Sequence, residues 1–588
     1  MSVADVVGVA SALAEPHHDG SDAYILERPD ALGGRAVVRL RVPRAAAPAA
    51  VALRYVCDGE PFIVPATLDE ETGTDAWWRA SFPVANPTVN YRWLLSGGGV
   101  GYAWLNGLGV VTHEVPDGDD FVVAPGGGGP NWHLRSVVYE IFPDRFASSG
   151  LGGAAPEWAI PRAWDDLPIG RGKETPSELF GGDLRGVEQH LEHISQLGAN
   201  AIYFTPFFAA GSTHRYDATS FEHVDPLLGG DEALASLLAA AHARGIRVVG
   251  DLTLNHVGVG HEWFPTEREF FFFDESLPYG YEAWLGVHTL PKLNWASDEL
   301  RRRMVETVRH WLEFGLDGWR IDVANMVGRY RDRDLNGDVA RVVRDTAGDS
   351  LLLAEHGHDF RSDLDGTGWH GAMNYSGFLR PTWWWLRGDA FDQDPFLALP
   401  APRYTGAQAV ATMRAFRAGM PWQSVLHSWT LLDSHDTARF KTVAGSRGGQ
   451  VVGIGLQMTT PGVPMVFAGD ELGLEGAWGE DARRTMPWDR PDAWDQALLE
   501  EYRRLIALRR SSDTLAHGGI RYAFVGDDAI AYLRETPEET LLCLAARAAH
   551  EPIRVPFRTL ETLYGDDAED GVLPADGPAF HVWRLIDG

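Results

Sequence analysis

Two parts of the chain, one near each end, carry the alternating apolar and polar positions of β-strands. Near the N-terminus, runs at 36–42 (AVVRLRV), 51–56 and 90–95 are separated by Pro, Gly and Asp clusters, a spacing typical of an all-β sandwich. We therefore predict an N-terminal β-sandwich over residues 22–124. The next residues, 125–130, read PGGGGP, which predicts a linker because Gly and Pro interrupt regular structure.

From about residue 512 the chain is β-rich again. The runs at 529–533 and 580–585 have the length and composition of strands. They predict a second, smaller β-sandwich domain over residues 512–588.

Between these two parts, a helix followed by a strand recurs. Asp183 is suited to cap a helix whose apolar residues, from Leu184 to Leu197, lie at helical spacing and stop at Gly198; residues 201–205 (AIYFT) then form a strand. The same unit returns, as helix and strand, at 231–244 and 246–250, 298–314 and 317–321, 338–347 and 351–354, and 449–458 and 463–467. Continuous apolar strands between amphipathic helices predict a parallel sheet covered on both faces. Over residues 131–511 this repeat favours an α/β fold of the (β/α)8 TIM-barrel type, with a doubly wound sheet as the structural alternative.

Composition narrows the class of protein and of partner. The chain has 588 residues, of which 45% are hydrophobic and 23% charged, which is ordinary for a globular protein. Its formal net charge of -31 would repel phosphate backbones and anionic lipid, which argues against nucleic acid and membrane as partners. No apolar run approaches the roughly 18 residues that a membrane span needs. The 22 tryptophans suit either a packed core or a sugar-binding cleft.

The first residues have some features of a signal peptide. Residues 6–14 form a short apolar stretch that ends in Ala-Leu-Ala. The residues before it contain no Lys or Arg and do contain Asp5, which is the wrong charge for that role. We therefore interpret residues 1–21 as a mobile leader and expect a cytoplasmic protein.

Polar clusters follow several of the predicted barrel strands. They are Asp251 and His256 in DLTLNH, Arg320 and Asp322 in GWRIDVAN, Glu355 after 351–354, and His435 and Asp436 in LLDSHDTAR. The carboxyl ends of barrel strands meet at one rim, where the active sites of such barrels are built. A single carboxylate there is more often a helix cap or a loop residue, whereas several carboxylates, each beside a His or Arg, indicate catalysis.

Taken together, these stretches resemble the α-amylase family of retaining glycoside hydrolases, and the resemblance covers nearly the whole chain. DLTLNH, GWRIDVAN, the strand before Glu355 and SHD correspond in order and spacing to the four main conserved segments of that family. LPKLN at 290–294 closely resembles the MPKLN stretch of the neopullulanase, cyclomaltodextrinase and maltogenic amylase group. Further landmarks of that group are YEIFPDRF from Tyr139, FGGDLRGV from Phe180, THRYDATSFEHVDPLLGG from Thr213 and FAGDELG from Phe467.

The resemblance implies a role for each candidate residue. Asp322 would be the nucleophile, Glu355 the general acid/base, and Asp436 the third carboxylate, which holds the distorted sugar. The implied binding residues are Tyr216, which would stack on the sugar ring, His256 and His435, which would bind sugar hydroxyls, and Asp217 and Asp251, which would brace the site.

Cleavage of an acetal at neutral pH needs a protonated acid at the leaving oxygen and an anion under the anomeric carbon. Arg320 lies two residues before Asp322, on the same face of its strand, and we expect it to keep Asp322 ionised. We expect Glu355, partly buried near that anion, to hold its proton longer. Retention of configuration would place the two carboxyl groups roughly 5 to 5.5 Å apart.

The chain departs from the family pattern in two stretches that bear on substrate. His356 and Gly357 follow Glu355, where typical neopullulanases have a hydrophobic residue and a Trp. This is more similar to maltodextrin glucosidases and hydrolases of cyclic maltosyl-maltose, and it weakens the case for transglycosylation and for α-1,6 cleavage. After Asp322 the chain lacks the Lys-His pair of many liquefying amylases, which weakens the case for endo-hydrolysis of long starch.

A third departure concerns calcium. Relatives often bind Ca²⁺ in the loop after YxIFPxRF, where Asn and Asp supply oxygen ligands. Here that loop, 147–150 (ASSG), contains no carboxylate, although Asp183 remains. Because Ca²⁺ takes about six to eight oxygen ligands, we expect that site to be empty and assign no cofactor or metal.

The resemblance also predicts domain roles and partners. The N-terminal module resembles the sugar-binding-type module of the neopullulanase group, which commonly covers the partner's active site in a dimer. This predicts a homodimer and a pocket for small substrates. Residues 259–294 would form a short B-domain insertion that walls the cleft. The leading hypothesis is a hydrolase of α-1,4 bonds in small or cyclic malto-oligosaccharides. The alternatives are a maltodextrin α-glucosidase, or a neopullulanase or maltogenic amylase with transglycosylation; a non-catalytic sugar-binding barrel would need a lost carboxylate, and none is lost.

Overall fold

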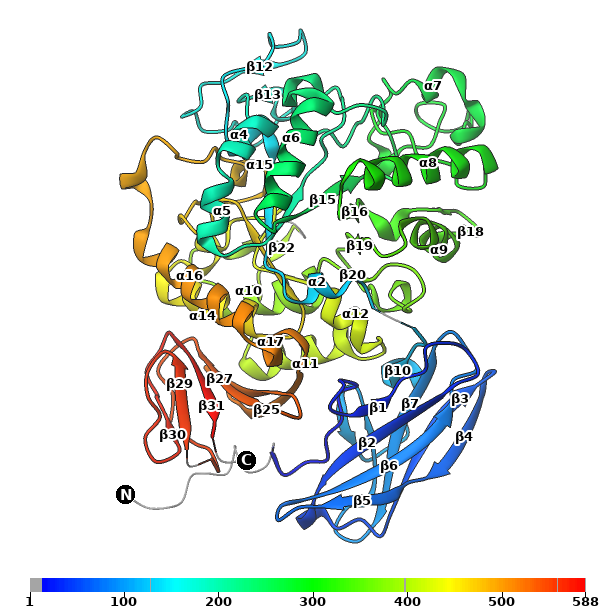
Figure 1. The fold of residues 1–588 in the computed structure, drawn as a ribbon, viewed down its shortest axis with the longest axis vertical. Helices are drawn as coiled ribbons and strands as arrows, with labels where there is room; N and C mark the ends of the chain where they lie inside the picture. The colour runs from blue at the N-terminus through cyan, green and yellow to red at the C-terminus, as the bar shows by residue number, and fades with distance from the viewer. Residues whose placement is uncertain (1–12, 127, 396–397, 558, 587–588) are drawn as a thin grey trace.

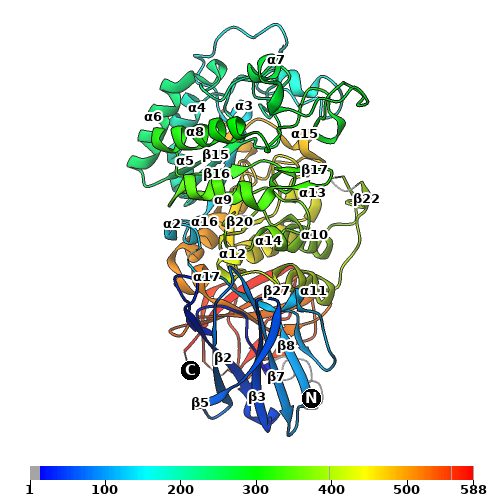
Figure 2. The same ribbon diagram turned by 90° about the vertical axis from the view of Figure 1, so that its right-hand side faces the viewer.

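The structure is a computed structural model that describes residues 13–126, 128–395, 398–557 and 559–586 (Figure 1). The middle of the chain forms a parallel barrel, and the parts of the sequence before and after it form antiparallel sheets. In Figures 1 and 2 both flanking parts lie below the barrel. The predicted linker includes Gly127, which lies outside the described residues. Among the described helices, none combines the length and the apolar character that a membrane span requires.

The N-terminal part consists of two antiparallel sheets that pack face to face. One sheet has the order β1-β2-β6-β5 and the other the order β4-β3-β7-β8-β9, with β10 beside β7. The strands are β1 (Ile25–Glu27), β2 (Arg35–Pro43), β3 (Ala50–Cys57), β4 (Glu60–Pro65), β5 (Thr67–Glu71), β6 (Asp75–Pro83), β7 (Val89–Gly97), β8 (Gly101–Asn106), β9 (Gly109–Val111) and β10 (Phe121–Val123). The rings of Tyr55 and Phe82 stack between the sheets with centroids 5.3 Å apart. This is the β-sandwich that the alternating pattern predicts.

The middle of the chain forms the predicted parallel barrel. Its strand order is β20-β19-β16-β15-β14-β11-β24-β23, and all neighbouring pairs are parallel. The strands are β11 (Val138–Ile141), β14 (Ala201–Phe204), β15 (Arg247–Leu252), β16 (Gly318–Ile321), β19 (Leu351–Ala354), β20 (Gly371–Ala372), β23 (Trp429–Leu431) and β24 (Val463–Phe467). A parallel bridge between Met373 and Trp429 joins the two ends of the sheet. The sheet is therefore a nearly closed barrel, and the doubly wound alternative is wrong.

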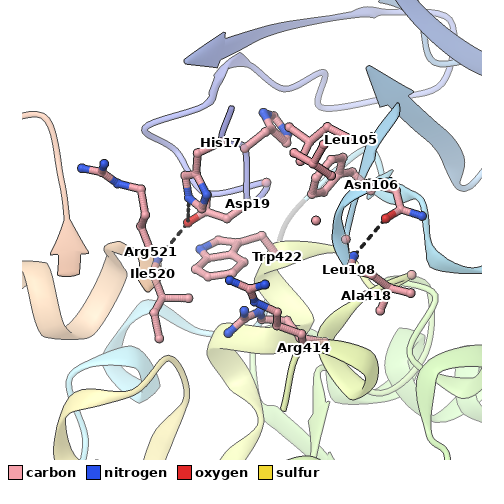
Figure 3. A pocket seen from close by; sticks show the side chains of 18 of the residues that line it. His17, Asp19, Leu105, Asn106, Leu108, Arg414, Ala418, Trp422, Ile520 and Arg521 are labelled. Carbon is pink, nitrogen blue, oxygen red and sulfur yellow. Dashed lines mark hydrogen bonds and ion pairs between the residues drawn. The ribbon is translucent and has the colours of Figure 1, made fainter. Parts of the chain in front are cut away.

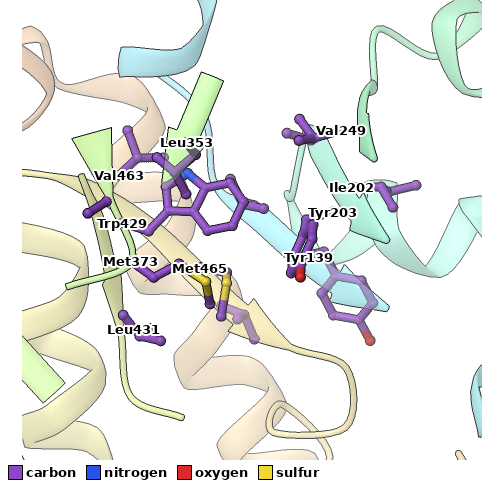
Figure 4. Packing of buried hydrophobic residues seen from close by; sticks show 14 of the residues in the cluster. Tyr139, Ile202, Tyr203, Val249, Leu353, Met373, Trp429, Leu431, Val463 and Met465 are labelled. Atoms are coloured by element: carbon purple, nitrogen blue, oxygen red, sulfur yellow. The ribbon is translucent and has the colours of Figure 1, made fainter. Parts of the chain in front are cut away.

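Side chains from the strands fill the inside of the barrel (Figure 4). Every residue of β11, β14, β16, β19 and β24 is buried. The rings of Tyr203 and Trp429 lie 5.2 Å apart in this core, and Figure 4 draws them together with Leu353 and Met465. Because helices cover the outer face of the sheet as well, the strands appear in the sequence as continuous apolar runs.

The helices lie outside the strands, each with one apolar face toward the barrel. In α8 (Asp298–Phe314), Ser297 caps the first turn by accepting a hydrogen bond from Leu300 N, and Gly315 ends the helix. Its buried residues recur at helical spacing: Leu300, Met304, Val308 and Trp311. The other long helices are α6 (Gly230–Ala243), α9 (Asn336–Ala347), α11 (Gly406–Arg417), α14 (Arg447–Thr459) and α16 (Gln496–Ser511).

One predicted helix is divided in two. The apolar run that begins at Leu184 forms α4 (Leu184–Gln189) and α5 (Leu191–Leu197), because His190 between them leaves helical geometry. Asp183 caps α4, and Gly198 ends α5 in the left-handed conformation with a φ of 96°. The predicted start and stop are thus confirmed, and the break between them was not predicted.

Between β15 and α8 the chain leaves the barrel and folds as a short insertion. It contains α7 (Trp263–Thr266) and the 3-10 turns η5 (Arg268–Phe270) and η6 (Trp284–Gly286). Within the insertion Phe270 is buried, and the ring of Trp284 lies 5.6 Å from that of His256. The insertion therefore reaches the carboxyl end of the barrel strands.

The C-terminal part is an antiparallel sheet of order β25-β26-β27-β31-β29, and a second small sheet pairs β28 with β30. The strands are β25 (Gly519–Val525), β26 (Ala529–Glu535), β27 (Thr540–Ala546), β28 (Ile553–Arg554), β29 (Leu560–Tyr564), β30 (Val572–Leu573) and β31 (Ala579–Leu585). Alternate residues of β27 belong to different cores: Cys543 packs with the barrel, whereas Leu542 and Leu544 pack within the C-terminal part. One face of the sheet thus docks on the barrel.

Residues 13–21 form a packed strap, which corrects the interpretation of this segment as a mobile leader; residues 1–12 lie outside the described residues. His17 forms a β-bridge with Arg41, and Asp19 accepts hydrogen bonds from Ser21 N at 3.0 Å and Ile520 N at 2.8 Å. Figure 3 shows the pocket at this junction, with Asp19 and Trp422 among its lining residues. The strap joins the N-terminal sandwich to β25, a partner so distant in sequence that no local pattern indicates it.

Candidate active site

The barrel strands bring most of the predicted site residues to one end. Asp251 lies in β15 one residue before its end, Asp322 directly follows β16, and Glu355 directly follows β19. His435 and Asp436 lie in the loop after β23. Because the strands are parallel, these side chains all lie at the carboxyl end of the sheet.

Arg320, in β16, is the fully buried centre of the cluster. Its Nη1 donates to Asp251 Oδ2 at 2.9 Å and to Asp322 Oδ1 at 3.0 Å. Its Nη2 lies 3.1 Å from Glu355 Oε2. One guanidinium therefore contacts carboxylates from three neighbouring strand ends, and these contacts compensate the cost of burying its charge.

Asp322 and Glu355 each directly follow one of two neighbouring strands, and Glu355 contacts the backbone turn that begins after Asp322. Val323 N donates to Glu355 Oε2 at 2.7 Å. Val323 has a φ of 37°, which is unusual for a β-branched residue and marks strain at this turn. Both groups that contact the Glu355 carboxyl lie at Oε2, so its Oε1 makes no hydrogen bond or ion pair within the described residues.

The Glu355 carboxylate affects the titration of Asp322. Burial and the nearby Glu355 carboxylate raise the pKa of Asp322 well above its usual value, although Arg320 acts in the opposite direction. This differs from the expectation that Arg320 by itself would keep Asp322 ionised. Arg320 is thus the contact that favours the ionised form of Asp322, and it acts against burial and the Glu355 carboxylate.

Asp436 lies between two basic groups. Arg483 Nη2 donates to Asp436 Oδ1 at 2.9 Å, and His435 Nε2 lies 3.2 Å from Asp436 Oδ2. Burial would raise the pKa of Asp436, but His435 and Arg483 together lower it. Burial would lower the pKa of His435, but Asp436 and Glu140 together raise it. The arrangement favours an ionised Asp436 beside a protonated His435.

Tyr216 lies against His435 and Asp251. Its hydroxyl donates to Asp251 Oδ2 at 3.0 Å and lies 2.8 Å from His435 Nε2. Its ring stacks on the His435 ring with centroids 5.7 Å apart. Asp251 also accepts a hydrogen bond from the Tyr203 hydroxyl at 2.6 Å. Asp251 is thus the anion that ties Tyr216 and Arg320 together.

His256 joins the cluster, whereas Asp217 does not. His256 Nε2 lies 3.7 Å from Asp322 Oδ2. Burial and the nearby Lys292 cation lower the pKa of His256 to about 3, so its ring is neutral. The Asp217 carboxylate accepts a hydrogen bond from the Ser212 hydroxyl of its own loop, and within the described ranges it bonds to none of the carboxylates above.

Three further residues of the cluster were not identified from the sequence: Glu140, Tyr203 and Arg483. Glu140 lies in β11, where every residue is buried, and an ionisable residue inside a continuous apolar strand was the signal that could have revealed it. Tyr203 occupies a similar position in β14. Arg483 lies in a loop after β24 with no periodic pattern around it, so nothing in the sequence distinguishes it.

The residues at the expected calcium loop do not fit a calcium site. Ser149 N and Ser149 Oγ donate to Asp183 Oδ2 at 3.0 Å and 2.8 Å, and Gly186 N donates to Oδ1 at 2.7 Å. Both carboxylate oxygens therefore already accept hydrogen bonds from protein donors. In the part of the chain that the structure describes, no group of three or more His, Cys, Asp or Glu residues could hold a metal ion.

His356, which follows Glu355, is buried and bound to a neighbouring carboxylate. Its Nε2 lies 3.2 Å from Asp363 Oδ2, and Arg329 donates to both oxygens of Asp363 at 2.7 Å and 2.8 Å. His356 therefore supports the loop after β19, where the family resemblance places a Trp one position later.

Comparison with known proteins supports the same family. A family model described as the alpha amylase catalytic domain matches residues 140–364. A cyclomaltodextrinase of Geobacillus thermopakistaniensis (strain MAS1) is 32% identical over 459 residues, which cover 73% of this chain and 71% of the relative. An intracellular maltogenic amylase of Bacillus subtilis is 30% identical over 435 residues, which cover 70% of this chain and 68% of the relative.

A solved structure agrees with these sequence matches. The ligand-free cyclic alpha-maltosyl-(1→6)-maltose hydrolase from Arthrobacter globiformis has a TM-score of 0.66 and 29% identity, over 78% of this chain and 99% of that chain. The barrel, the ordered motifs and the relatives all lead to one assignment. This chain belongs to the α-amylase family of glycoside hydrolases.

Proposed function

We propose that this glycoside hydrolase cleaves α-1,4-glucosidic bonds of small or cyclic malto-oligosaccharides, with retention of configuration, by double displacement through a glycosyl-enzyme. The observation that carries the proposal is that one buried guanidinium, Arg320, contacts both Asp322 and Glu355 at adjacent strand ends. A retaining mechanism needs two carboxyl groups in this relationship, one ionised and one protonated.

In the first step Glu355 donates its proton to the glycosidic oxygen while Asp322 attacks the anomeric carbon. Among the described residues Glu355 Oε1 has no hydrogen-bond or ion-pair partner, so in this proposal it is the oxygen that carries the proton. Arg320 holds Asp322 Oδ1, which leaves Oδ2 to form the bond to the sugar. In the second step Glu355 removes a proton from water, the water attacks the anomeric carbon, and Asp322 is released.

The surrounding residues have binding roles in this proposal. Asp436 is the ionised carboxylate that accepts hydrogen bonds from sugar hydroxyls, and Arg483 and His435 keep it ionised. Tyr216 stacks on the sugar at the cleavage point. The remaining members of the site bind hydroxyls or hold these residues in place: His256, His435, Arg320 and Asp251. Asp217 would brace only its own loop, through Ser212.

The substrate class rests on the names of relatives and on the flanking sandwich. Relatives are named for activity on cyclomaltodextrins and on cyclic maltosyl-maltose.

The sandwich exposes apolar side chains at Phe62, Ile63 and Leu68, which would be covered in the homodimer that we propose through this part of the chain. We also propose a cytoplasmic location, as the name of the intracellular relative suggests. Light scattering would test the dimer.

The reaction is tested by the configuration of the first product. Proton NMR of fresh digests should reveal α-anomers before mutarotation, because double displacement retains configuration. Glu355→Gln and Asp322→Asn should each abolish hydrolysis, while the exposed carboxylate variant Asp338→Asn should keep wild-type rates. β-Anomers, or turnover by Glu355→Gln, would contradict the proposed roles.

The substrate is tested by initial rates on cyclodextrins, cyclic maltosyl-maltose, maltotriose, pullulan and starch. We expect the small and cyclic substrates to react fastest. A fast rate on starch alone would refute the proposed substrate class. Transfer products from maltotriose would favour the maltogenic amylase alternative, and single glucose units released from linear chains would favour the α-glucosidase alternative.

A further inference from the structure

The LPKLN segment lies against the strand end that carries His256. Lys292 forms an antiparallel bridge with His256, and Leu293 N donates to Asn255 O at 2.9 Å. Lys292 is 4% exposed, and its Nζ donates to the Asn255 side-chain oxygen and, at 2.9 Å, to Met326 O. Lys292 therefore links the segment before His256 to the turn after Asp322, without touching either residue through its side chain.

In each hydrogen bond of the Asn255 side chain, with Lys292 and with His256, chemistry determines which group donates and which accepts. An ammonium group only donates hydrogen bonds, so Asn255 must present its oxygen to Lys292. The Asn255 amide nitrogen then lies on the other side, 3.2 Å from His256 Nδ1. An amide nitrogen also only donates, so His256 Nδ1 must be the acceptor and carry no proton. The proton of the neutral His256 ring must therefore be on Nε2.

The opposite side of the His256 ring faces the nucleophile. Nε2 is buried, makes no hydrogen bond within the described residues, and lies 3.7 Å from Asp322 Oδ2. Burial and the Lys292 cation lower the pKa of His256 to about 3, although the Tyr216 backbone acts in the opposite direction. The ring thus stays neutral, with its N–H donor held beside Asp322.

We infer that Lys292 is a positioning residue that, through Asn255, sets the tautomer of His256 and so presents Nε2–H as a hydrogen-bond donor to a hydroxyl of the bound glucan. The inference rests on the proposed function for the identity of the ligand. It gives a physical reason for the lysine in LPKLN. Lys292 orients the Asn255 amide, which in turn orients the neutral His256 ring, and the Lys292 ammonium group itself does not contact the substrate.

The tautomer is tested in the free protein. In ¹⁵N-histidine-labelled protein, two-bond correlation NMR distinguishes a protonated Nε2 from a protonated Nδ1, and a His256→Asn variant identifies the His256 signals by their absence. Wild type should have the proton on Nε2. Asn255→Asp keeps the side-chain volume and still accepts from Lys292, but it cannot donate to Nδ1. This variant should therefore move the proton to Nδ1 or leave the ring charged, and an unchanged Nε2–H signal would overturn the inference.

Kinetics supply the second readout. Lys292→Met and Asn255→Asp should each lower kcat/KM by about 100-fold, the typical loss of an oriented donor, while the exposed variant Lys173→Met should have no effect. In the His256→Asn background, Lys292→Met should cost little more, because both changes remove the same donor. Losses that multiply instead would mean that Lys292 acts independently of His256, and the inference would be wrong.

The two levels of the proposal fail separately. If wild type cleaves no α-glucan, the proposed function fails, but the NMR comparison of wild type with Asn255→Asp still tests the tautomer. If wild type is active and Lys292→Met is folded, judged by its melting temperature, with unchanged kcat/KM, only the role of Lys292 is refuted. Should Lys292→Met fail to fold, Asn255→Asp, which keeps a partner for Lys292, decides the outcome.

Discussion

His435 Nδ1 lies 2.5 Å from Glu140 Oε1, and both side chains are fully buried. Glu140 lies in β11, whereas His435 lies in the loop after β23, so the contact joins residues 295 positions apart in the sequence. The other ring nitrogen, Nε2, contacts the Tyr216 hydroxyl and Asp436. Together with Asp436, Glu140 therefore raises the pKa of a ring that also contacts the Tyr216 hydroxyl.

Replacing Glu140 by Gln should shift the pH dependence of the enzyme. Glu140 helps to raise the pKa of His435, so His435 stays charged to a higher pH in wild type than it would without this partner. In Glu140→Gln the charge should be lost at lower pH, and the basic limb of kcat/KM should move to lower pH. We expect at least about tenfold less activity at neutral pH. The control is Glu192→Gln, on an exposed helix face; identical pH profiles for wild type and Glu140→Gln would contradict the role of Glu140.

Acid should destabilise the barrel through two buried histidines. Trp429 Nε1 donates to His133 Nε2 at 2.8 Å, so the proton of His133 lies on Nδ1, 2.9 Å from His427 Nδ1. Burial lowers the pKa of His133, and it lowers the pKa of His427 to about 3, from an ordinary value of 6.5. The unfolded chain therefore takes up protons first as the pH falls below 6.5. The free energy of unfolding should fall by about 1.4 kcal/mol per pH unit for each such histidine.

Urea unfolding at a series of pH values measures this slope. His427→Gln removes one titrating group. The free energy of unfolding should therefore fall less steeply between about pH 6 and pH 4 in this variant than in wild type. The exposed His223→Gln variant should leave the slope close to that of wild type. Equal slopes in His427→Gln and wild type would mean that other groups account for the acid sensitivity.

The strap should contribute to stability through Asp19. Asp19→Asn weakens a buried acceptor of two backbone N–H groups, which should lower the free energy of unfolding by about 1 to 3 kcal/mol. Burial would raise the pKa of Asp19, but His17 and Ser21 lower it overall. This contribution should therefore be present at neutral pH and be lost as the pH falls below the ordinary Asp value of 3.8. Melting temperatures of Asp19→Asn and of the exposed control Glu15→Gln provide the comparison; equal values would show that the strap contributes nothing.

Trp284 should affect substrate binding more than chemistry. Its ring lies 5.6 Å from that of His256, while the next residue, Leu285, is 73% exposed. Trp284→Ala should raise KM by about tenfold, consistent with the loss of about 1.4 kcal/mol of contact with a sugar, and should change kcat less. Leu285→Ala serves as the matched control on the same turn. Unchanged KM in Trp284→Ala would remove the insertion from the proposed binding site.

Local patterns in the sequence predicted the helices and strands of the barrel, and the resemblance to the α-amylase family indicated the proposed catalytic carboxylates. A strand buried on both faces requires a continuous apolar run, and an amphipathic helix requires helical spacing, so both can be recognised within about 15 residues. Asp322 and Glu355 follow predicted strands, and all three carboxylates, Asp436 included, were identified through the family motifs that contain them. Short β20 and the break at His190 escaped prediction, because neither leaves an apolar period long enough to recognise.

The contacts that set charge and proton position depended on the tertiary structure. Glu140 with His435, Arg483 with Asp436, and Asp19 with β25 pair residues from distant segments, and hydrogen-bond direction depends on distances that no local pattern encodes. The tertiary structure also decided the place of tryptophans that composition could assign either to the core or to a sugar-binding cleft. Four of them are fully buried core residues: Trp311, Trp319, Trp383 and Trp429. The sequence by itself determined the succession of helices and strands, because that depends on local periodicity, and its ordered motifs, through the resemblance to a known family, indicated the proposed catalytic residues. The tertiary structure decided which groups share protons, because that depends on which atoms meet in space.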